Sequence, residues 1–512
     1  MRILLWHGWL LEGSGSNVYT ARVTRIFREQ GHDVLLVCQE GHSDRYEWID
    51  AVGTVGVDGV SELDPTGASP AAGRCVVLRP RIGTLLPVFV LDDYEGFEVK
   101  RFVDLSDGEL AAYLDANVEA LRAAAAWHGT EVAIAGHAVP GGVIARRALG
   151  PDRYVTKIHG SDVEYAMRPD ARYRDLAREG LPAGRAVTGS GGDVLRRCLD
   201  LVPGIEALLR VVPPGVDEAV FHPRPRAPAL TEVAERLRGD PDATRGRPGR
   251  LDGEVRAALA ARDGRALDEL AFRYDQEVPD PDAAERLAAL AAFEGPVVGS
   301  FGKLIPQKGV HHLLAAVHGS PHRPHTLVVG FGTNREWLHS LAAALERADG
   351  SALEWLAGAL GLPGLTAAAG EPAGVTFTGR LDHRYAPSVL AAMDVLVVPS
   401  ILDEAFGMVA VEGAAAGALP LVARHSGLAE IAGALEEDTG RVGLFAFEPG
   451  PAAVANLRAG LDHLLGLPGA DRDELRAAVS AAAQTRWSWT STAAGLLRAA
   501  TGTDGALSGP KA

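Results

Sequence analysis

Apolar residues occur along this chain in short runs, separated by amphipathic stretches and by turns rich in Gly and Ser. Residues 2–6 form the first run, and a loop at 13–16 leads into a helix that should continue to about Gln30, where Gly31 would end it. Residues 34–38 form the next run. Strand and helix signals that alternate from the first residue predict a doubly wound α/β fold.

The same alternation continues through both halves of the chain. Further strands are expected at 132–135, 154–158, 186–188 and 209–212, and again at 297–301, 394–398 and 419–423. Pro213, Pro214 and Gly215 mark a domain boundary, because two prolines cannot continue a central strand. We therefore expect one domain at 1–213 and a second at 214–470. Residues 224–290 contain PDPD, RGRPGR and several helix-like stretches, and are interpreted as a mostly helical insertion without a chemical role.

Composition narrows the class of protein. A chain of 512 residues exceeds one ordinary core, and 47% hydrophobic with 23% charged residues is typical of a globular protein. No apolar run approaches the roughly 18 residues needed to span a bilayer. The start of the chain contains His7 and lacks a small-residue cleavage site, so we interpret it as a strand and not as a signal sequence.

Charge and cysteine content bear on partners and location. The formal net charge of −16, with no dominant basic tract, argues against a nucleic-acid partner. Arginines in ARRALGPDRYVTK and RPDARYRDLAREG are interpreted as a solvated face, with an anionic acceptor or a membrane surface as the alternative. Only Cys38, Cys75 and Cys198 are present, without CxxC spacing, which favours a reducing compartment and a cytoplasmic protein. A homo-oligomer is left open.

A pair of acids eight positions apart, Glu404 and Glu412, stands out in PSILDEAFGMVAVEGAAAG. On one continuous helix their side chains would point about 80° apart, so they would not share a face. The apolar run before them ends at Pro399, and residues 410–416 are strongly helix-forming. Glu404 is therefore expected in a strand-to-helix loop, and Glu412 on the helix that follows.

The residues between the two acids suit an anionic ligand. Gly407 allows close approach of the backbone, and the first free N–H groups of the helix, around Met408 and Val409, would face an anion. Carboxylates for hydroxyl groups together with a positive helix end for phosphate fit a nucleotide-sugar site.

A second loop of the same kind lies about 100 positions upstream, in VVGSFGKLIPQKGVHHLLAAV. The strand at 297–301 runs into Gly302, Lys303 and Lys308, and a helix begins near Gly309. Two lysines on a strand-to-helix loop are the charges that neutralise a diphosphate leaving group.

Taken together, these residues resemble the retaining GT-B glycosyltransferases of family 4, which carry an E-x7-E motif. GHDVLLVCQE is similar to the family's first βαβ unit, and residues 211–223 are similar to its hinge. LVVGFGTNREWL and VTFTGRLDHRYAPSVLAAMDVLVVPS resemble the strands that lead to the nucleotide base, which places Arg380 and Leu381 at that site. The resemblance covers the chain except about 224–290 and 345–372. This sequence departs from the family at Lys303, where family members commonly have Arg. Lysine keeps the charge but lacks the planar fork that makes a bidentate contact with phosphate.

The resemblance implies a fold and an activity. The fold would be α/β of the GT-B type, with two Rossmann-like domains facing a central cleft. The C-terminal helices at about 470–505 would cross back onto the first domain, where Trp487 and Trp489 would pack and not bind a ligand. The activity would be a retaining, metal-independent transfer of a hexose from a nucleotide diphosphate sugar, UDP favoured, to an unidentified acceptor. No cofactor is expected, since the nucleotide sugar is a co-substrate. No metal site is expected either, because lysines would bind the phosphates.

The resemblance also assigns roles in the second domain. Lys303 and Lys308 would stabilise charge on the departing diphosphate. Glu412 would bind the ribose hydroxyls and Glu404 the hydroxyls of the donor sugar. The backbone from Phe406 to Val409 would complete the grip on the donor.

Candidate residues of the first domain lie at the ends of its predicted strands. The loop with Gly15 and Ser16 follows the first strand, but Val18 replaces the third Gly of a dinucleotide fingerprint, so an NAD site is disfavoured. In the GT-B interpretation its amides would contact sugar or acceptor. His137 would lie near the primary hydroxyl of the sugar. Acceptor-side contacts are expected from His159, Ser161 and Asp162.

Two other functions stay open on the sequence. An epimerase of nucleotide sugars can share the architecture, and it would convert donor without any acceptor. A non-catalytic binder of sugar nucleotides would bind donor without turnover, although the intact acids and lysines argue against it. Inverting chemistry would need a base, for which His137 is the candidate.

Overall fold

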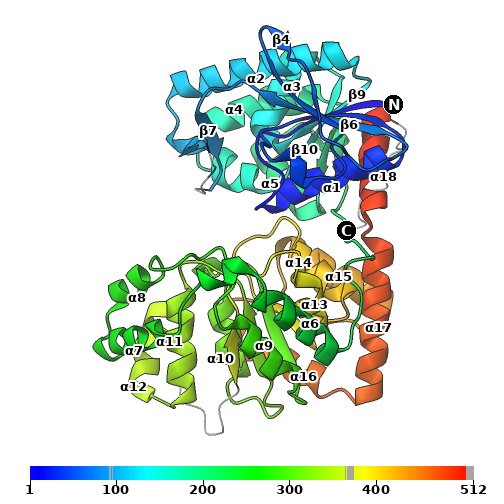
Figure 1. The fold of residues 1–512 in the computed structure, drawn as a ribbon. Coiled ribbons are helices and arrows are strands. Elements are labelled where there is room, and N and C mark those ends of the chain that lie inside the picture. The colour runs from blue at the N-terminus through cyan, green and yellow to red at the C-terminus, as the bar shows by residue number, and fades with distance from the viewer. Residues whose placement is uncertain (91–93, 95, 364, 366–373, 503–512) are drawn as a thin grey trace. The chain divides into compact units, whose positions relative to one another are not determined.

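The computed structural model describes residues 1–90, 94, 96–363, 365 and 374–502, and it divides into two compact units (Figure 1). Unit 1 comprises Met1–Gly215 together with the segment from Ser488 onward, and unit 2 comprises Val216–Trp487. The first crossing therefore follows Gly215, directly after the two prolines that mark the boundary in the sequence. The chain crosses back at Ser488.

Unit 1 is built on a sheet of ten strands in the order β12-β11-β10-β9-β1-β2-β6-β3-β4, with β5 beside β3. Its strands are β1 (Arg2–Trp6), β2 (Asp33–Val37), β3 (Ala51–Gly56), β4 (Gly59–Val60), β5 (Asp64–Pro65), β6 (Arg74–Pro80), β9 (Val132–Gly136), β10 (Tyr154–Lys157), β11 (Ala186–Gly189) and β12 (Leu209–Val211). Only β4 and β5 pair antiparallel, both with β3. A separate pair, β7 (Leu85–Val88) and β8 (Glu98–Arg101), is parallel.

The helices of unit 1 are α1 (Gly15–Glu29), α2 (Asp107–His128), α3 (Gly142–Leu149), α4 (Ala171–Gly180), α5 (Gly192–Leu201) and α18 (Trp489–Thr501). Local sequence explains where two of them begin. Ser14 caps α1 by accepting from the Asn17 N–H at 3.3 Å. Ser106 and Glu109 form a reciprocal capping box on α2. Such caps pair N–H groups that have no acceptor within the helix, which fixes the first turn.

Unit 2 contains one parallel sheet of six strands, ordered β15-β14-β13-β16-β17-β18. Its strands are β13 (Val297–Phe301), β14 (His325–Val329), β15 (Val375–Phe377), β16 (Val395–Val398), β17 (Leu419–Ala423) and β18 (Ala446–Phe447). This is the 3-2-1-4-5-6 order of Rossmann sheets. The apolar sequences of β16 and β17 are buried along their full length, as expected where helices cover both faces of a sheet.

The helices of unit 2 are α6 (Arg226–Arg238), α7 (Leu251–Ala261), α8 (Gly264–Leu270), α9 (Ala283–Ala291), α10 (Val310–Val317), α11 (Arg335–Glu346), α12 (Gly350–Leu360), α13 (Ala386–Ala391), α14 (Met408–Ala415), α15 (Ser426–Thr439), α16 (Ala453–Leu465) and α17 (Gly469–Arg486). The segment at 224–290 is helical, but it is not one separate body. Helices α6 and α9 pack together and join the main core of the unit. Helices α7 and α8 form a small core of their own and contact α11.

The C-terminal helices differ from the expectation that all of 470–505 returns to the first domain. Helix α17 stays in unit 2, where it packs on α14 and α15 and buries Leu475, Val479 and Ala483. Only α18 belongs to unit 1, beside α1. Trp487 packs on Phe406 in unit 2, whereas Trp489 packs on Tyr19 in unit 1. Both indoles are buried, but in different units, because the crossing lies between them.

Candidate functional site

The candidate residues of unit 2 gather where the order of its strands reverses. Strand β13 pairs with β14 on one side and with β16 on the other, so the connections after β13 and β16 run to opposite faces of the sheet. Such switch points leave a crevice at the carboxyl ends of the strands, where open α/β sheets bind ligands. The loop after β13 carries Lys303 and Lys308, and the loop after β16 carries Glu404.

Lys308 and Glu404 meet across these two loops. The ammonium of Lys308 donates to Oε1 of Glu404, and Oγ of Ser400 donates to the same oxygen at 2.9 Å. The backbone N–H of Glu404 donates to Oγ of Ser426 at 3.0 Å. The Lys308 and Glu404 side chains are 29% and 17% exposed, so the fixed ion pair remains within reach of a ligand.

Gly309 lets the two loops approach this closely. Its φ is +68°, and a Cβ at this position would lie 2.0 Å from the carbonyl oxygen of Pro399. The N–H of Ile401 also donates to the carbonyl of Gln307, at 2.8 Å. Any side chain at 309 would push the lysine loop away from the β16 loop, so the glycine is a condition for the ion pair.

Helix α14 begins directly after the acidic loop. Gly407 precedes it with a φ of +100°, and within the described chain no side chain caps this helix. The N–H groups of Met408 and Val409 therefore form a positive helix end. Glu412 lies one turn further along and is partly buried. The side chain of Phe406 packs in the core, so only its backbone lies at the loop.

Lys303 and Arg380 flank one aromatic ring that the sequence analysis did not identify. Nζ of Lys303 lies 5.8 Å from the centre of the Phe331 ring, and the Arg380 guanidinium lies 5.3 Å from it. Arg380 also pairs with Glu277 at 2.6 Å, and Leu381 is buried in the core. Phe331 stands between two glycines just after a predicted strand, a pattern that could have revealed it.

Unit 1 has its own switch point, since β1 pairs with β2 on one side and β9 on the other. His137 follows β9 with a φ of +69° and is 1% exposed. Its ring lies 4.6 Å from Trp9, 4.9 Å from Phe89 and 4.5 Å from His159, measured between ring centres. Burial holds the pKa of His137 well below its ordinary value, so the ring is neutral at pH 7.

His7 connects the glycine loop to this cluster, and sequence reasoning had assigned it no role. It follows β1, and its Nε2 donates to Oδ1 of Asn17 at 2.9 Å. Burial lowers the pKa of His7 to about 4. Gly15 and Ser16 open α1 beside this contact, Gly15 exposed and Ser16 partly buried, and present the N-terminal end of the helix.

Asp162 was expected to face a substrate hydroxyl, and the structure corrects this. Its side chain is completely buried. The carboxylate accepts from the backbone N–H groups of Ala138 at 2.6 Å, Gly160 at 2.8 Å, Val163 at 3.1 Å and His159 at 3.3 Å. Asp162 therefore ties the loop after β9 to the loop after β10. Ser161 and His159, both partly buried, remain beside it.

Comparison with known proteins bears on this geometry. Residues 295–461 match the model of the family described as Glycosyl transferases group 1. The matched segment contains both lysines and both glutamates of the unit 2 site. The chain is a glycosyltransferase of GT-B fold.

Solved structures share the fold over nearly the whole length of the glycosyltransferase. Sucrose-phosphate synthase from Thermosynechococcus elongatus is 17% identical, with 96% of each chain covered and a TM-score of 0.55. HepE (Alr3699) of Anabaena, solved with UDP and glucose, is 15% identical, with 98% of this chain and 100% of that chain covered and a TM-score of 0.57. No curated protein sequence matches the glycosyltransferase significantly.

A buried lysine of the glycosyltransferase was also missed from the sequence. Lys157, at the end of β10, is 1% exposed, and its ammonium donates to the carbonyl of Val212 at 3.0 Å. It also lies 4.9 Å from the centre of the Tyr19 ring. Burial lowers the pKa of Lys157 to about 7. Burial opposes the charged form of this ammonium, whereas the nearby carboxylate of Asp162 favours it.

Two further features of the glycosyltransferase concern metals and membranes. Within the described residues, no cluster of three or more His, Cys, Asp or Glu side chains is arranged to hold a metal ion. No helix in the described ranges is both long and apolar enough to cross a membrane.

Proposed function

We propose that this glycosyltransferase belongs to the retaining family 4 group, carries the E-x7-E motif of that group, and transfers a hexose from UDP-hexose to a hydroxyl acceptor without a metal ion. The observation that supports this is the Lys308–Glu404 contact at the switch point of unit 2, beside the uncapped start of α14. In this ion pair Lys308 would bind phosphate, and Glu404, directly beside it, would bind the hydroxyl groups of the sugar. UDP is favoured as the nucleotide because the similar Anabaena structure was solved with UDP and glucose.

The departing diphosphate is stabilised by fixed positive groups. An ammonium has three donors, so Lys308 can keep its bond to Glu404 and still donate to phosphate oxygens. Lys303 adds a second charge, and the N–H groups of Met408 and Val409 add a third contact. Because Lys308 is held by Glu404 and the two N–H groups by helix α14 before the reaction, they do not need to reorganise as charge develops. A divalent cation then becomes dispensable.

Transfer with retention needs bond formation on the face that the leaving group vacates. The bond between sugar C1 and the diphosphate oxygen breaks, and that oxygen takes the electron pair. The acceptor oxygen then bonds to C1 from the same side and gives its proton to the departing phosphate. Glu404 holds the sugar through its hydroxyls during this step, and Glu412 holds the ribose. Arg380, whose guanidinium lies 5.3 Å from the centre of the Phe331 ring, would contact the base of the nucleotide.

Unit 1 supplies the groups proposed for the acceptor and, in His137, the group proposed for the primary hydroxyl of the donor sugar. Gly15 and Ser16 offer backbone N–H groups, and His137, His159 and Ser161 offer neutral polar atoms. A neutral imidazole in a dry site can donate or accept a hydrogen bond, which suits a hydroxyl better than an anion. The three cysteines are free and buried, which favours a reducing compartment such as the cytoplasm.

A donor panel tests the proposal. UDP-glucose, UDP-galactose, GDP-mannose and ADP-glucose are incubated with the protein and an acceptor mixture, and nucleotide release is measured. We expect release from a UDP donor, and an α-linked product from an α-linked donor when the product is analysed by NMR. A β-linked product would refute retention, and release from none of the donors would refute the donor assignment.

A further inference from the structure

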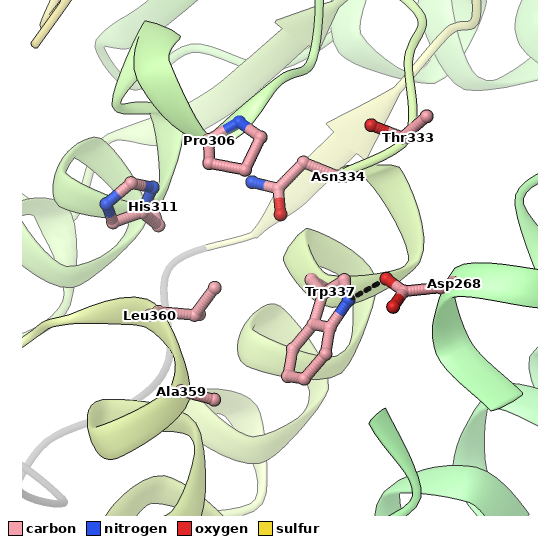
Figure 2. A pocket seen from close by; sticks show the side chains of 8 residues that line it. All are labelled: Asp268, Pro306, His311, Thr333, Asn334, Trp337, Ala359 and Leu360. Carbon is pink, nitrogen blue, oxygen red and sulfur yellow. Dashed lines mark hydrogen bonds between the residues drawn. The ribbon is translucent and has the colours of Figure 1, made fainter. Parts of the chain in front are cut away.

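A cavity in unit 2 lies outside the proposed donor site (Figure 2). It encloses about 190 Å³ between the loop after β13, helices α10 and α11, and the ends of α8 and α12. The residues that matter for its chemistry are Asp268, Pro306, His311, Asn334, Trp337 and Leu360. None of the residues assigned to the donor forms its wall.

Two polar side chains of this cavity are buried without a partner. His311 and Asn334 are 3% and 4% exposed. Nδ1 of His311 and Nδ2 of Asn334 have no hydrogen-bond partner among the residues that the structure describes. In Figure 2 the Asn334 amide points into the space between His311 and Trp337. Buried polar groups are normally paired, so unpaired groups at a cavity indicate a ligand that completes them.

The opposite wall is aromatic and rigid. Nε1 of Trp337 donates to Oδ1 of Asp268 at 2.8 Å, and the indole stacks on Trp355 with ring centres 5.3 Å apart. Leu360 adds an apolar edge to the same side, as Figure 2 shows. A wall held in this way loses little freedom when a ligand binds. The exposed carboxylate of Asp268 places negative charge at the rim and disfavours anions.

We propose that this cavity binds a neutral polyhydroxyl molecule of the size of one monosaccharide. Its volume lies below the roughly 300 Å³ at which sites for drug-sized ligands begin, so a nucleotide does not fit. Hydroxyl groups both donate and accept, so they can pair with an amide N–H, with a neutral imidazole and with a carboxylate. Burial lowers the pKa of His311 to about 3, which keeps that ring neutral.

The cavity touches the loop that carries Lys308 without including Lys308. Pro306 begins the short turn Pro306–Lys308, and the N–H of Asn334 donates to the carbonyl of Leu304 at 2.9 Å. A bound molecule would therefore rest on the backbone that positions the lysine. The proposal does not depend on the transferase mechanism, because binding at this place can be measured without turnover.

Saturation-transfer NMR with the whole protein tests the proposal. The probes are D-glucose and myo-inositol, with glucose 6-phosphate as an anionic control, and excess UDP is present to occupy the donor site. We expect a dissociation constant on the order of 1 mM for a neutral probe, as for other ligands of this size. Glucose 6-phosphate should bind at least tenfold more weakly. Binding that disappears in UDP would overturn the proposal, because the probe would then have occupied the donor site.

Two variants locate the binding. Asn334→Leu replaces the unpaired amide by an apolar side chain of similar volume. It should weaken the binding of the neutral probes at least tenfold. Asp268→Asn keeps an acceptor for the Trp337 N–H but removes the negative charge. The dissociation constants of glucose and glucose 6-phosphate should then lie within about threefold of each other. Asp268→Asn alters only an exposed side chain, so it decides the question if Asn334→Leu fails to fold. Wild-type behaviour of both variants, or no binding to the native protein, would refute the cavity as a site.

Discussion

The two units place opposite kinds of chemistry at equivalent positions of their sheets. In unit 1 the switch point between β1 and β9 holds His7 and His137, each 1% exposed, among aromatic rings. In unit 2 the switch point between β13 and β16 holds Lys308 and Glu404 as a partly exposed ion pair. The fold therefore determines where a site lies, whereas burial determines whether its groups stay charged.

This difference has a functional reason under the proposed mechanism. A diphosphate carries charge that must be met by cations, and these keep their charge only while they remain paired and partly hydrated. An acceptor hydroxyl carries no charge and gains from a dry site in which hydrogen bonds are strong. Lys157, at the end of β10 in unit 1, is buried, and its pKa is lowered to about 7.

The largest effect on the transfer rate is expected from removing the cations of the unit 2 site. Lys308→Ala should lower turnover about 10²- to 10³-fold, the scale for losing one fixed electrostatic group. Lys303→Ala should act similarly, whereas Lys303→Arg should be tolerated. Lys100→Ala provides a matched control, because Lys100 also forms an ion pair, with Glu109, but in unit 1. Initial rates at saturating donor measure the effect. Near-native rates for both alanine variants at 303 and 308 would remove the diphosphate assignment.

A smaller effect should separate the two acids of unit 2. Glu412→Gln should weaken binding of free UDP on the order of tenfold, since a charge-assisted hydrogen bond to ribose contributes about 1.5–3 kcal/mol. Glu404→Gln should leave UDP affinity nearly unchanged but slow transfer, because its partner is the sugar. Calorimetry with UDP and initial rates on both variants provide the measurement. The opposite pattern would exchange the two roles.

Low pH should lower the stability of unit 1, because its buried histidines are neutral in the folded protein. Burial lowers the folded-state pKa values of His7, His137 and His159, so the unfolded chain binds more protons below pH 6.5. Stability is therefore present above pH 6.5 and is lost as pH falls towards the folded-state values, by about 1.4 kcal/mol per pH unit for each ring. Hydrogen exchange of β1, β9 and β10, corrected for intrinsic rates, should show this loss between pH 7 and 5. His159→Phe should reduce the loss, and an unchanged pH dependence would contradict the assignment.

The smallest effect concerns metal ions. Treatment with a chelator should leave the transfer rate within about twofold of the untreated rate, because lysines and a helix terminus are assigned the charge on the leaving group. Rates are measured after dialysis against EDTA, with and without added Mg²⁺ or Mn²⁺. Complete loss that Mg²⁺ or Mn²⁺ restores would show that the charge of the diphosphate is met in another way.

Much of the fold could be predicted because its central strands are continuous apolar runs. The strands expected at 2–6, 297–301 and 419–423 coincide with β1, β13 and β17, and the α/β fold of GT-B type is confirmed. The strands β3 to β8 of unit 1 were not predicted. In β3 the sequence AVGTVG mixes glycine and threonine with apolar residues and so lacks a clear period. The apolar stretches of β6 and β7 are short and lie next to proline or arginine.

The site was predicted less evenly. Lys308 and Glu404 were found because loop residues after buried strands are visible as breaks in the apolar pattern. Phe331, His7 and Lys157 were missed, because each gains its meaning from a partner on another strand or loop. Asp162 was assigned to a substrate because it follows a predicted strand, although four backbone N–H groups around it donate to its carboxylate.

The sequence by itself determined which central segments of the two sheets form strands, where the chain turns after them and which charged groups stand at those turns, since these depend on neighbours within one element. The tertiary structure alone decided that β13 lies beside β16, which brings Lys308 to Glu404 over 96 positions. It also decided that α17 stays with unit 2 and that Asp162 is buried. These outcomes depend on the order of strands in a sheet and on which apolar faces meet, and short-range sequence patterns do not encode either.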